Sequence, residues 1–198
     1  MLLFDSQVSG NCYKVRLLCA HLGLAYERRE VDVVHRRGRS ELLGELNPAL
    51  RVPALILDDG RPLAESDAIL CYLAEGTPYL PTDRYERAQV LQWLFFEQYS
   101  HEPYIAVLRF WAEFAPNPPP SSEVEAKRKG GAAALSAMER HLRTRRFLVG
   151  ERYTIADVAL YAYTHVADEA GFELAAHPAV TDWLVRVAAQ PGHVTIDA

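Results

Sequence analysis

The segment from Ser9 to Leu17 (SGNCYKVRL) carries the residue types best suited to chemistry in this chain. A short apolar run, Leu2 to Phe4, precedes it, and apolar residues at helical spacing follow it, which predicts a strand, a loop and a helix. Ser9 and Asn11 stand where that helix would begin, and taken alone they favour simple helix capping. Because a helix N-terminus also carries partial positive charge, the same turn could hold an anion such as a thiolate.

The composition of the chain excludes several classes of protein. Its 198 residues, 49% of them hydrophobic, are enough for one large or two small cores. A formal net charge of -5 gives no general electrostatic case for binding nucleic acid or a membrane surface. Three cysteines without ligand-like clustering imply neither a disulfide framework nor a metal site. With no targeting segment and no unbroken apolar run of about 18 residues, we expect a soluble protein of a reducing compartment.

The first 75 residues predict an α/β domain with the order βαβαββα. Strands are expected at residues 2–4, 26–33, 52–57 and 62–64, and helices after Ser9, at residues 40–46 and from Ser66. The first strand-helix-strand unit should be parallel. Asp59-Gly60, which lies between two apolar runs, predicts a hairpin.

The remainder of the chain predicts only helices. Residues 76–84 read as a linker, and residues 85–198 form the second domain. A long helix over residues 84–114 should be interrupted near Pro103, and a second helix is expected at 123–145. The segment from Thr154 to Asp157 is a capping box that opens a buried helix, and an amphipathic helix follows at 178–189. The expected fold is therefore α/β plus all-α.

Three motifs together resemble the cytosolic glutathione S-transferase family. They are the Ser-x-Asn turn, Asn47-Pro-x-x-x-Val-Pro-Ala-Leu55, and Glu65-Ser-x-Ala-Ile69 at the start of a helix. In this order, and with the capping box, they cover nearly the whole chain. The turn is most similar to that of bacterial, nu-class-like members with Ser or Thr before x-Asn. The resemblance implies a thioredoxin-like domain that binds glutathione, an all-helical domain that binds a hydrophobic substrate, and a cytoplasmic homodimer without a metal.

The Val52-Pro53 bond is where the sequence alone and the resemblance differ. Only about 5–6% of X-Pro bonds in folded proteins are cis, so the sequence alone favours trans. In the resembled family this proline is cis, and the backbone of Val52 would pair with the peptide backbone of glutathione like an added strand.

The resemblance places the other end of glutathione at Glu65 and Ser66. Ser66 could cap the helix that follows, and its N–H group would suit the α-carboxylate of the γ-glutamyl group. Glu65 would offset the neighbouring α-ammonium. Arg51 could bind a carboxylate, although an arginine in a loop is often simply solvated. Asp67 could reach the glutathione of another subunit, as in some relatives, or only favour the helix dipole.

At the sulfur atom, Ser9 is expected to donate a hydrogen bond and not to act as a base, with Asn11 as a second donor. Cys12 falls inside the helix, where a small buried thiol is the favoured interpretation. The second substrate, a hydrophobic electrophile or a disulfide, is assigned to Tyr104 and Phe110 in an aromatic stretch that also contains Tyr99, His101 and Trp111.

The leading hypothesis is thus a glutathione S-transferase that activates the glutathione thiolate. Alternatives are a glutathione-dependent disulfide reductase that uses the same site, an isomerase or dehalogenase, and a non-catalytic protein of this fold that binds glutathione or a partner protein.

Overall fold

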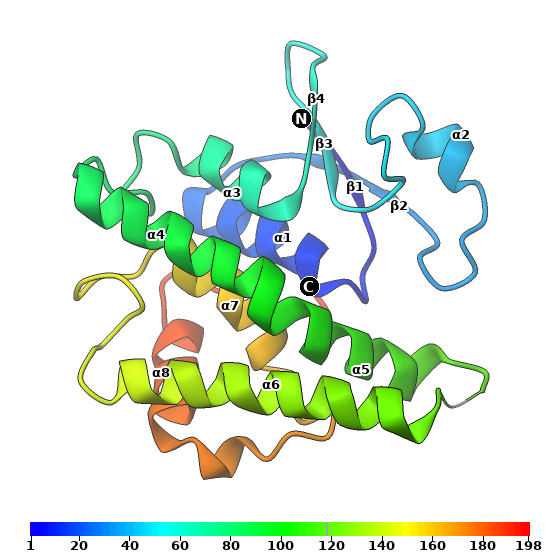
Figure 1. The fold of residues 1–198 in the computed structure, drawn as a ribbon. Helices are drawn as coiled ribbons and strands as arrows, with labels where there is room; N and C mark the ends of the chain where they lie inside the picture. Colours follow the sequence, from blue (N-terminus) through cyan, green and yellow to red (C-terminus); the bar gives the residue numbers. More distant parts are fainter. Residues whose placement is uncertain (118) are drawn as a thin grey trace. The chain divides into compact units, whose positions relative to one another are not determined.

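The computed structural model describes residues 1–117 and 119–198. It divides the chain into two compact units. The first comprises residues 1–75 and 191–198, and the second comprises residues 76–190 (Figure 1). The first boundary coincides with the end of the predicted α/β domain. Residues 191–198 belong to the first unit, whereas the sequence pattern predicts them in the helical domain.

The first unit has the predicted order βαβαββα. Its elements are β1 (Leu2–Asp5), α1 (Gly10–Leu22), β2 (Glu27–Glu30), α2 (Arg39–Leu43), β3 (Ala54–Ile56), β4 (Pro62–Ala64) and α3 (Ser66–Ala74). The sheet order is β2-β1-β3-β4. As predicted, β1 and β2 are parallel, and β3 and β4 form an antiparallel hairpin. This arrangement confirms the thioredoxin-like fold.

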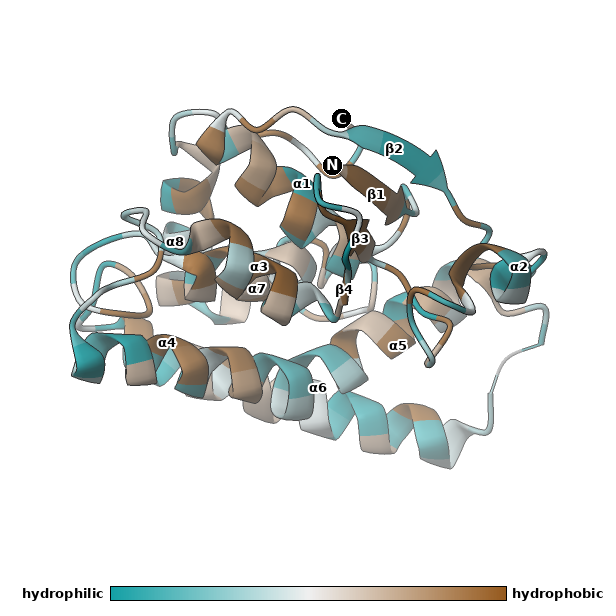
Figure 2. Ribbon diagram, turned by 90° about the horizontal axis from the view of Figure 1, so that it is seen from above, coloured by the Kyte–Doolittle hydropathy of each residue, from teal (hydrophilic) through white to brown (hydrophobic). Residues whose placement is uncertain are grey.

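Hydropathy explains which strands form the core of this unit. Figure 2 shows β1 and β3 mostly in brown and β2 in teal, because the sequence of β2 is Glu-Arg-Arg-Glu and all four residues are exposed. The core cluster joins both inner strands to α1 and α3 and consists of Leu3, Val15, Cys19, Leu55, Leu57 and Ile69. β2 is therefore an edge strand whose charges keep it from pairing further.

The second unit is helical throughout its named elements. They are α4 (Arg84–Phe96), a π-helix (Glu97–His101), α5 (Glu102–Phe114), α6 (Ser121–Leu142), α7 (Ile155–Thr164), a 3-10 helix (Leu174–Ala176) and α8 (Pro178–Ala188). The predicted long helix is indeed interrupted just before Pro103. A proline cannot donate the intrahelical hydrogen bond that would close the preceding turn, so the backbone widens there into π geometry.

The capping box of α7 is formed as predicted. The Thr154 N–H group donates to Asp157 Oδ2 at 2.9 Å, and Ala156 N–H donates to Thr154 Oγ1 at 3.3 Å. Asp157 Oδ1 also accepts from Leu148 N–H at 3.0 Å and from Trp183 Nε1 at 2.9 Å. Asp157 thus ties α7, the loop before it and α8 together inside the helical core.

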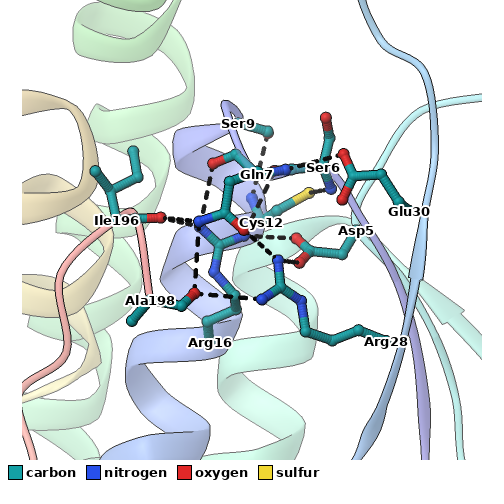
Figure 3. A network of polar contacts seen from close by, with 10 residues as sticks. All are labelled: Asp5, Ser6, Gln7, Ser9, Cys12, Arg16, Arg28, Glu30, Ile196 and Ala198. Atoms are coloured by element: carbon teal, nitrogen blue, oxygen red, sulfur yellow. Dashed lines mark hydrogen bonds and ion pairs between the residues drawn. The ribbon is translucent and has the colours of Figure 1, made fainter.

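Residues 191–198 are held against the rest of the first unit by side chains that donate hydrogen bonds to their carbonyl oxygens (Figure 3). Gln7 Nε2 donates to Ile196 O at 2.6 Å, and Arg16 Nη2 donates to the same oxygen at 2.7 Å. Tyr13 Oη donates to Val194 O at 2.7 Å. These donors come from the loop after β1 and from α1. In the described part of the chain, the helices are all too short or too polar to cross a membrane.

Candidate functional site

The strand register brings three sequence motifs to one end of the sheet. Ala54 of β3 pairs with both Phe4 of β1 and Ala64 of β4. The residues just before β3, just after β1 and just after β4 therefore lie at the same end. Those segments contain, respectively, the Val-Pro motif, the Ser-x-Asn turn and the Glu-Ser motif.

Ser9 is the N-cap of α1, as its position in the sequence predicted. Its Oγ accepts from Cys12 N–H at 3.3 Å, and its own N–H donates to Ser6 O at 3.0 Å. A hydroxyl that accepts one hydrogen bond still has a proton to donate. Capping and donation to a bound anion are therefore compatible roles for Ser9.

Asn11 and Ser66 bring the N-termini of α1 and α3 together. The Ser66 hydroxyl donates to Asn11 Oδ1 at 3.4 Å. An Asn amide accepts hydrogen bonds through its oxygen and donates through its nitrogen, so an anion would be bound through the nitrogen. Two helix N-termini that converge on one point add their partial positive charges, which favours an anion there.

Lys14 is a member of this cluster that sequence reasoning missed. Its side chain is 0% exposed, and its ammonium donates to Ser66 Oγ at 3.3 Å and forms an ion pair with Asp67 Oδ1 at 3.1 Å. A signal was present, because Lys14 follows Asn11 by three residues and precedes Leu18 by four, so it shares a helix face with both. A lysine on that face needs a buried partner, and α3 supplies Asp67.

The start of α3 differs from the prediction by one residue. Glu65, not Ser66, occupies the N-cap position, and the Glu65 side chain makes no capping hydrogen bond. Ser66 is the first helical residue, so its hydroxyl is available to Lys14 and Asn11. Glu65 has φ 68°, and a positive φ costs a non-glycine residue about 1–3 kcal/mol and is concentrated at functional sites.

The Val52-Pro53 peptide bond is cis. The trans bond that the sequence alone favoured is therefore wrong, and the cis bond implied by the family resemblance is confirmed. Asn47, which is 4% exposed, shapes the loop before this bond, since its Nδ2 donates to Arg51 O at 2.9 Å and its Oδ1 accepts from Ala49 N–H at 3.0 Å. The Arg51 side chain in this loop is exposed, and so is the Glu65 side chain at the start of α3.

A buried ionic network supports the turn from beneath (Figure 3). The Asp5 carboxylate is 0% exposed and pairs with Arg16 Nη1 at 2.7 Å and Arg28 Nη2 at 2.6 Å. Arg16 also donates to Gln7 O at 3.2 Å. A buried guanidinium with several acceptors holds the loop between β1 and α1 in one geometry.

Cys12 is a structural thiol, as predicted. It is fully buried, and its Sγ accepts from Ser6 N–H at 3.3 Å. Burial raises the pKa of the Cys12 thiol well above its usual range, with the nearby Asp5 carboxylate as a second cause. A thiol that stays protonated is a poor nucleophile.

The aromatic candidates of the helical unit have different surroundings. Tyr104 packs against α6, where a Cβ added to Gly130 would overlap its ring, and Lys127 Nζ lies 5.5 Å from the ring centroid. Phe110 is 37% exposed and packs beside Phe114 at a centroid distance of 5.4 Å. His101 is 0% exposed, with Nε2 2.9 Å from Thr164 Oγ1. Phe110 is therefore the more accessible of the two predicted substrate residues.

Among the residues that the structure describes, no cluster of three or more His, Cys, Asp or Glu side chains could hold a metal ion. The chemistry available at the shared end of α1 and α3 is that of hydrogen-bond donors, two helix N-termini and a buried ammonium.

Two family models match the chain. The glutathione S-transferase N-terminal domain matches residues 8–75, and the glutathione S-transferase C-terminal domain matches residues 88–191. The chain is 31% identical to the disulfide-bond oxidoreductase YfcG of Escherichia coli over 193 residues, which cover 91% of this chain and 87% of that protein.

Solved structures show the same relationship. A glutathione S-transferase from Pseudomonas fluorescens Pf-5 matches with a TM-score of 0.94 and 47% identity, and 98% of each chain is covered. Ure2p in complex with glutathione matches with a TM-score of 0.88 and 28% identity, covering 96% of this chain and 95% of that one. Both matches extend over the sheet-containing unit and the helical unit.

Proposed function

The chain belongs to the glutathione S-transferase family, and we propose that it activates the thiolate of glutathione for attack on a hydrophobic electrophile. One observation carries this proposal: the N-termini of α1 and α3 converge, with Ser66 Oγ 3.4 Å from Asn11 Oδ1. These two helix N-termini lie at the same end of the sheet as the cis Val52-Pro53 bond.

Glutathione would lie across this end as an extended peptide. We assign its γ-glutamyl α-carboxylate to Ser66 at the N-terminus of α3, and its α-ammonium to Glu65. The backbone of Val52, which makes no hydrogen bond to another described residue, would pair with the peptide backbone of glutathione. The exposed guanidinium of Arg51 could meet a carboxylate of the tripeptide.

Ser9 and Asn11 are assigned to the sulfur atom. A free thiol with a pKa of about 8.5 is mostly protonated at neutral pH, and the thiolate is the nucleophile. Lowering that pKa to about 6.5 requires about 2.7 kcal/mol of preferential stabilisation of the anion. The Ser9 hydroxyl, the Asn11 amide and the N-terminus of α1 together can supply an effect of this size.

The proposed reaction needs no base on the protein once the thiolate has formed. The sulfur lone pair forms a C–S bond with the electrophilic carbon, and the leaving group departs with its electron pair. We assign the hydrophobic substrate to Tyr104 and Phe110 of α5, of which Phe110 offers the more exposed ring.

The pKa of bound glutathione tests the proposal. The thiolate ultraviolet difference spectrum should be recorded against pH for the parent protein, for Ser9→Ala and for Ser9→Thr, which retains the hydroxyl. We expect Ser9→Ala to raise the pKa of the bound thiol by about one unit, and Ser9→Thr to restore it, because one hydrogen bond to a charged group contributes about 1.5–3 kcal/mol.

Cys12→Ala is the matched control on the same helix turn and should leave that pKa unchanged. Circular dichroism should accompany each variant, since loss of the Ser9 cap alone would cost about 1 kcal/mol of stability. If the parent binds glutathione without lowering its pKa, thiolate activation is refuted. If Ser9→Ala leaves the pKa as it was, Ser9 acts only as a cap.

A second candidate activity is glutathione-dependent disulfide reduction, which the similarity to YfcG supports. One disulfide and two glutathione molecules would yield two thiols and oxidised glutathione, with the same thiolate as the attacking group. A comparison of kcat/KM for 1-chloro-2,4-dinitrobenzene and for hydroxyethyl disulfide would separate the two activities. A kcat/KM for hydroxyethyl disulfide at least a hundredfold above that for 1-chloro-2,4-dinitrobenzene would favour the reductase.

We also propose that the protein is a cytoplasmic homodimer. The helical run of α4 and the π-helix exposes three aromatic side chains, with Tyr85 at 71%, Phe95 at 70% and Tyr99 at 82%. Phe95 and Tyr99 are four residues apart, so they lie on the same side of this helical run, and exposed aromatic side chains are enriched at protein–protein interfaces. The free cysteines agree with a reducing compartment.

A further inference from the structure

A second concave site lies within the helical unit. Residues from the C-terminal end of α6, the loop after it and one side of α8 line an open cavity of about 660 Å³. Its lining consists of Glu139, Leu142, Arg143, Thr144, Arg145, Arg146, Pro178, Ala179, Asp182 and Arg186. This volume falls within the range of about 300–1,000 Å³ that is typical of small-molecule sites.

Arginines dominate the charge of this cavity. Arg145 Nη1 donates only to nearby oxygens, at 3.4 Å to Thr144 Oγ1 and 3.5 Å to His141 O, and Arg186 Nε donates to Arg146 O at 3.0 Å. Among the described residues, no carboxylate lies within ion-pair distance of Arg145, Arg146 or Arg186. Three guanidinium groups thus line one cavity, and none of them forms an ion pair with a described carboxylate.

The buried carboxylate of the lining is already satisfied. Glu139 is 5% exposed, and its Oε2 accepts from Ala179 N–H at 2.9 Å and Val180 N–H at 3.1 Å at the start of α8. Its Oε1 accepts from Arg143 Nε at 3.3 Å. Glu139 therefore neutralises the helix N-terminus and one arginine, and Asp182 alone opposes the other three cations.

We propose that this cavity binds a small polyanion that carries two or more phosphate or sulfate groups. A guanidinium presents a planar fork of N–H donors that matches phosphate oxygens, and it is less strongly hydrated than an ammonium. Three such groups around one hollow suit several anionic groups on one molecule. The whole chain has a net charge of -5, so the positive charge of this cavity is confined to a small area. A small area of positive charge favours a small ligand over a long nucleic acid.

Inorganic tripolyphosphate is the probe, titrated into the full-length protein by isothermal calorimetry in 50 mM and 200 mM sodium chloride. Arg145→Ala is the most direct variant, because Arg145 bonds only to its own loop and helix end. We expect it to weaken binding about tenfold, the effect of losing one charge-assisted hydrogen-bonded contact. Arg140→Ala removes an exposed arginine of α6 that does not line the cavity, and it should leave the affinity within about twofold.

An equal loss of affinity in Arg140→Ala and Arg145→Ala would overturn the proposal, because it would show a general charge effect. Tripolyphosphate binding no tighter than orthophosphate binding would also overturn it, because the cavity would then hold one anionic group only. The glutathione-binding unit is not involved, so thiolate activation would be unaffected by either result.

Discussion

The pair of Lys14 and Asp67 makes the packing of α1 against α3 dependent on a buried charge. We predict that Lys14→Met destabilises the protein by about 3–5 kcal/mol, the range observed when one partner of a buried ion pair is removed. The Lys14 side chain is 0% exposed and that of Asp67 is 13% exposed, and Asp67 Oδ2 makes no hydrogen bond to a described residue. Without the ammonium, the Asp67 carboxylate would lose its only ion-pair partner in the described part of the chain.

The double variant Lys14→Met/Asp67→Asn separates charge from packing. It removes both charges at nearly constant volume, so its free energy of unfolding should return to within about 1 kcal/mol of the parent value. Urea unfolding of the four proteins in this cycle measures the coupling, which we expect to exceed about 2 kcal/mol.

Additive losses in the two single variants would refute the reasoning, as would a loss below about 1 kcal/mol in Lys14→Met. Glutathione affinity provides a second reading of the same cycle. Because Lys14 donates to Ser66 Oγ at 3.3 Å, the double variant should recover stability without recovering affinity. Full recovery of both would restrict Lys14 to a structural role.

Two further predictions concern the helical unit. Burial raises the pKa of Asp157 to about 6. The folded chain therefore holds this proton more tightly than the unfolded chain does. The resulting stabilisation is complete below about pH 4 and is lost as the pH rises through 6. Relative to Asp157→Asn, the unfolding free energy of the parent should therefore fall by about 2 kcal/mol between pH 4 and pH 6, and the same pH dependence of urea unfolding in both proteins would contradict this. The proposed homodimer should sediment at twice 22.3 kDa, and Phe95→Glu/Tyr99→Glu should sediment as a folded monomer; a monomeric parent would rule the dimer out.

Local sequence patterns predicted the elements of this protein well. Ser9 as the cap of α1, the capping box from Thr154 to Asp157 and the break before Pro103 all depend on residues within four positions of one another. The same is true of the β3–β4 hairpin at Asp59-Gly60. In each case the short-range backbone geometry is fixed by the residue type, so the pattern is visible in the sequence.

What only the tertiary structure decided involves partners far apart in the chain. Lys14 meets Asp67 across 53 positions, and Arg16 binds the carbonyl of Ile196 across 180. No local pattern indicates that a lysine is buried or that the last residues pack beside α1.

The cis bond at Val52-Pro53 and the shift of the α3 cap to Glu65 likewise depend on how β3, β4 and α3 are joined. The sequence by itself therefore determined that an anion could be held at the start of a helix. The fold decided that two helix starts, a buried lysine and a loop shaped by Asn47 converge there. The physical reason is that burial and long-range pairing, not local propensity, set the energies of charged groups.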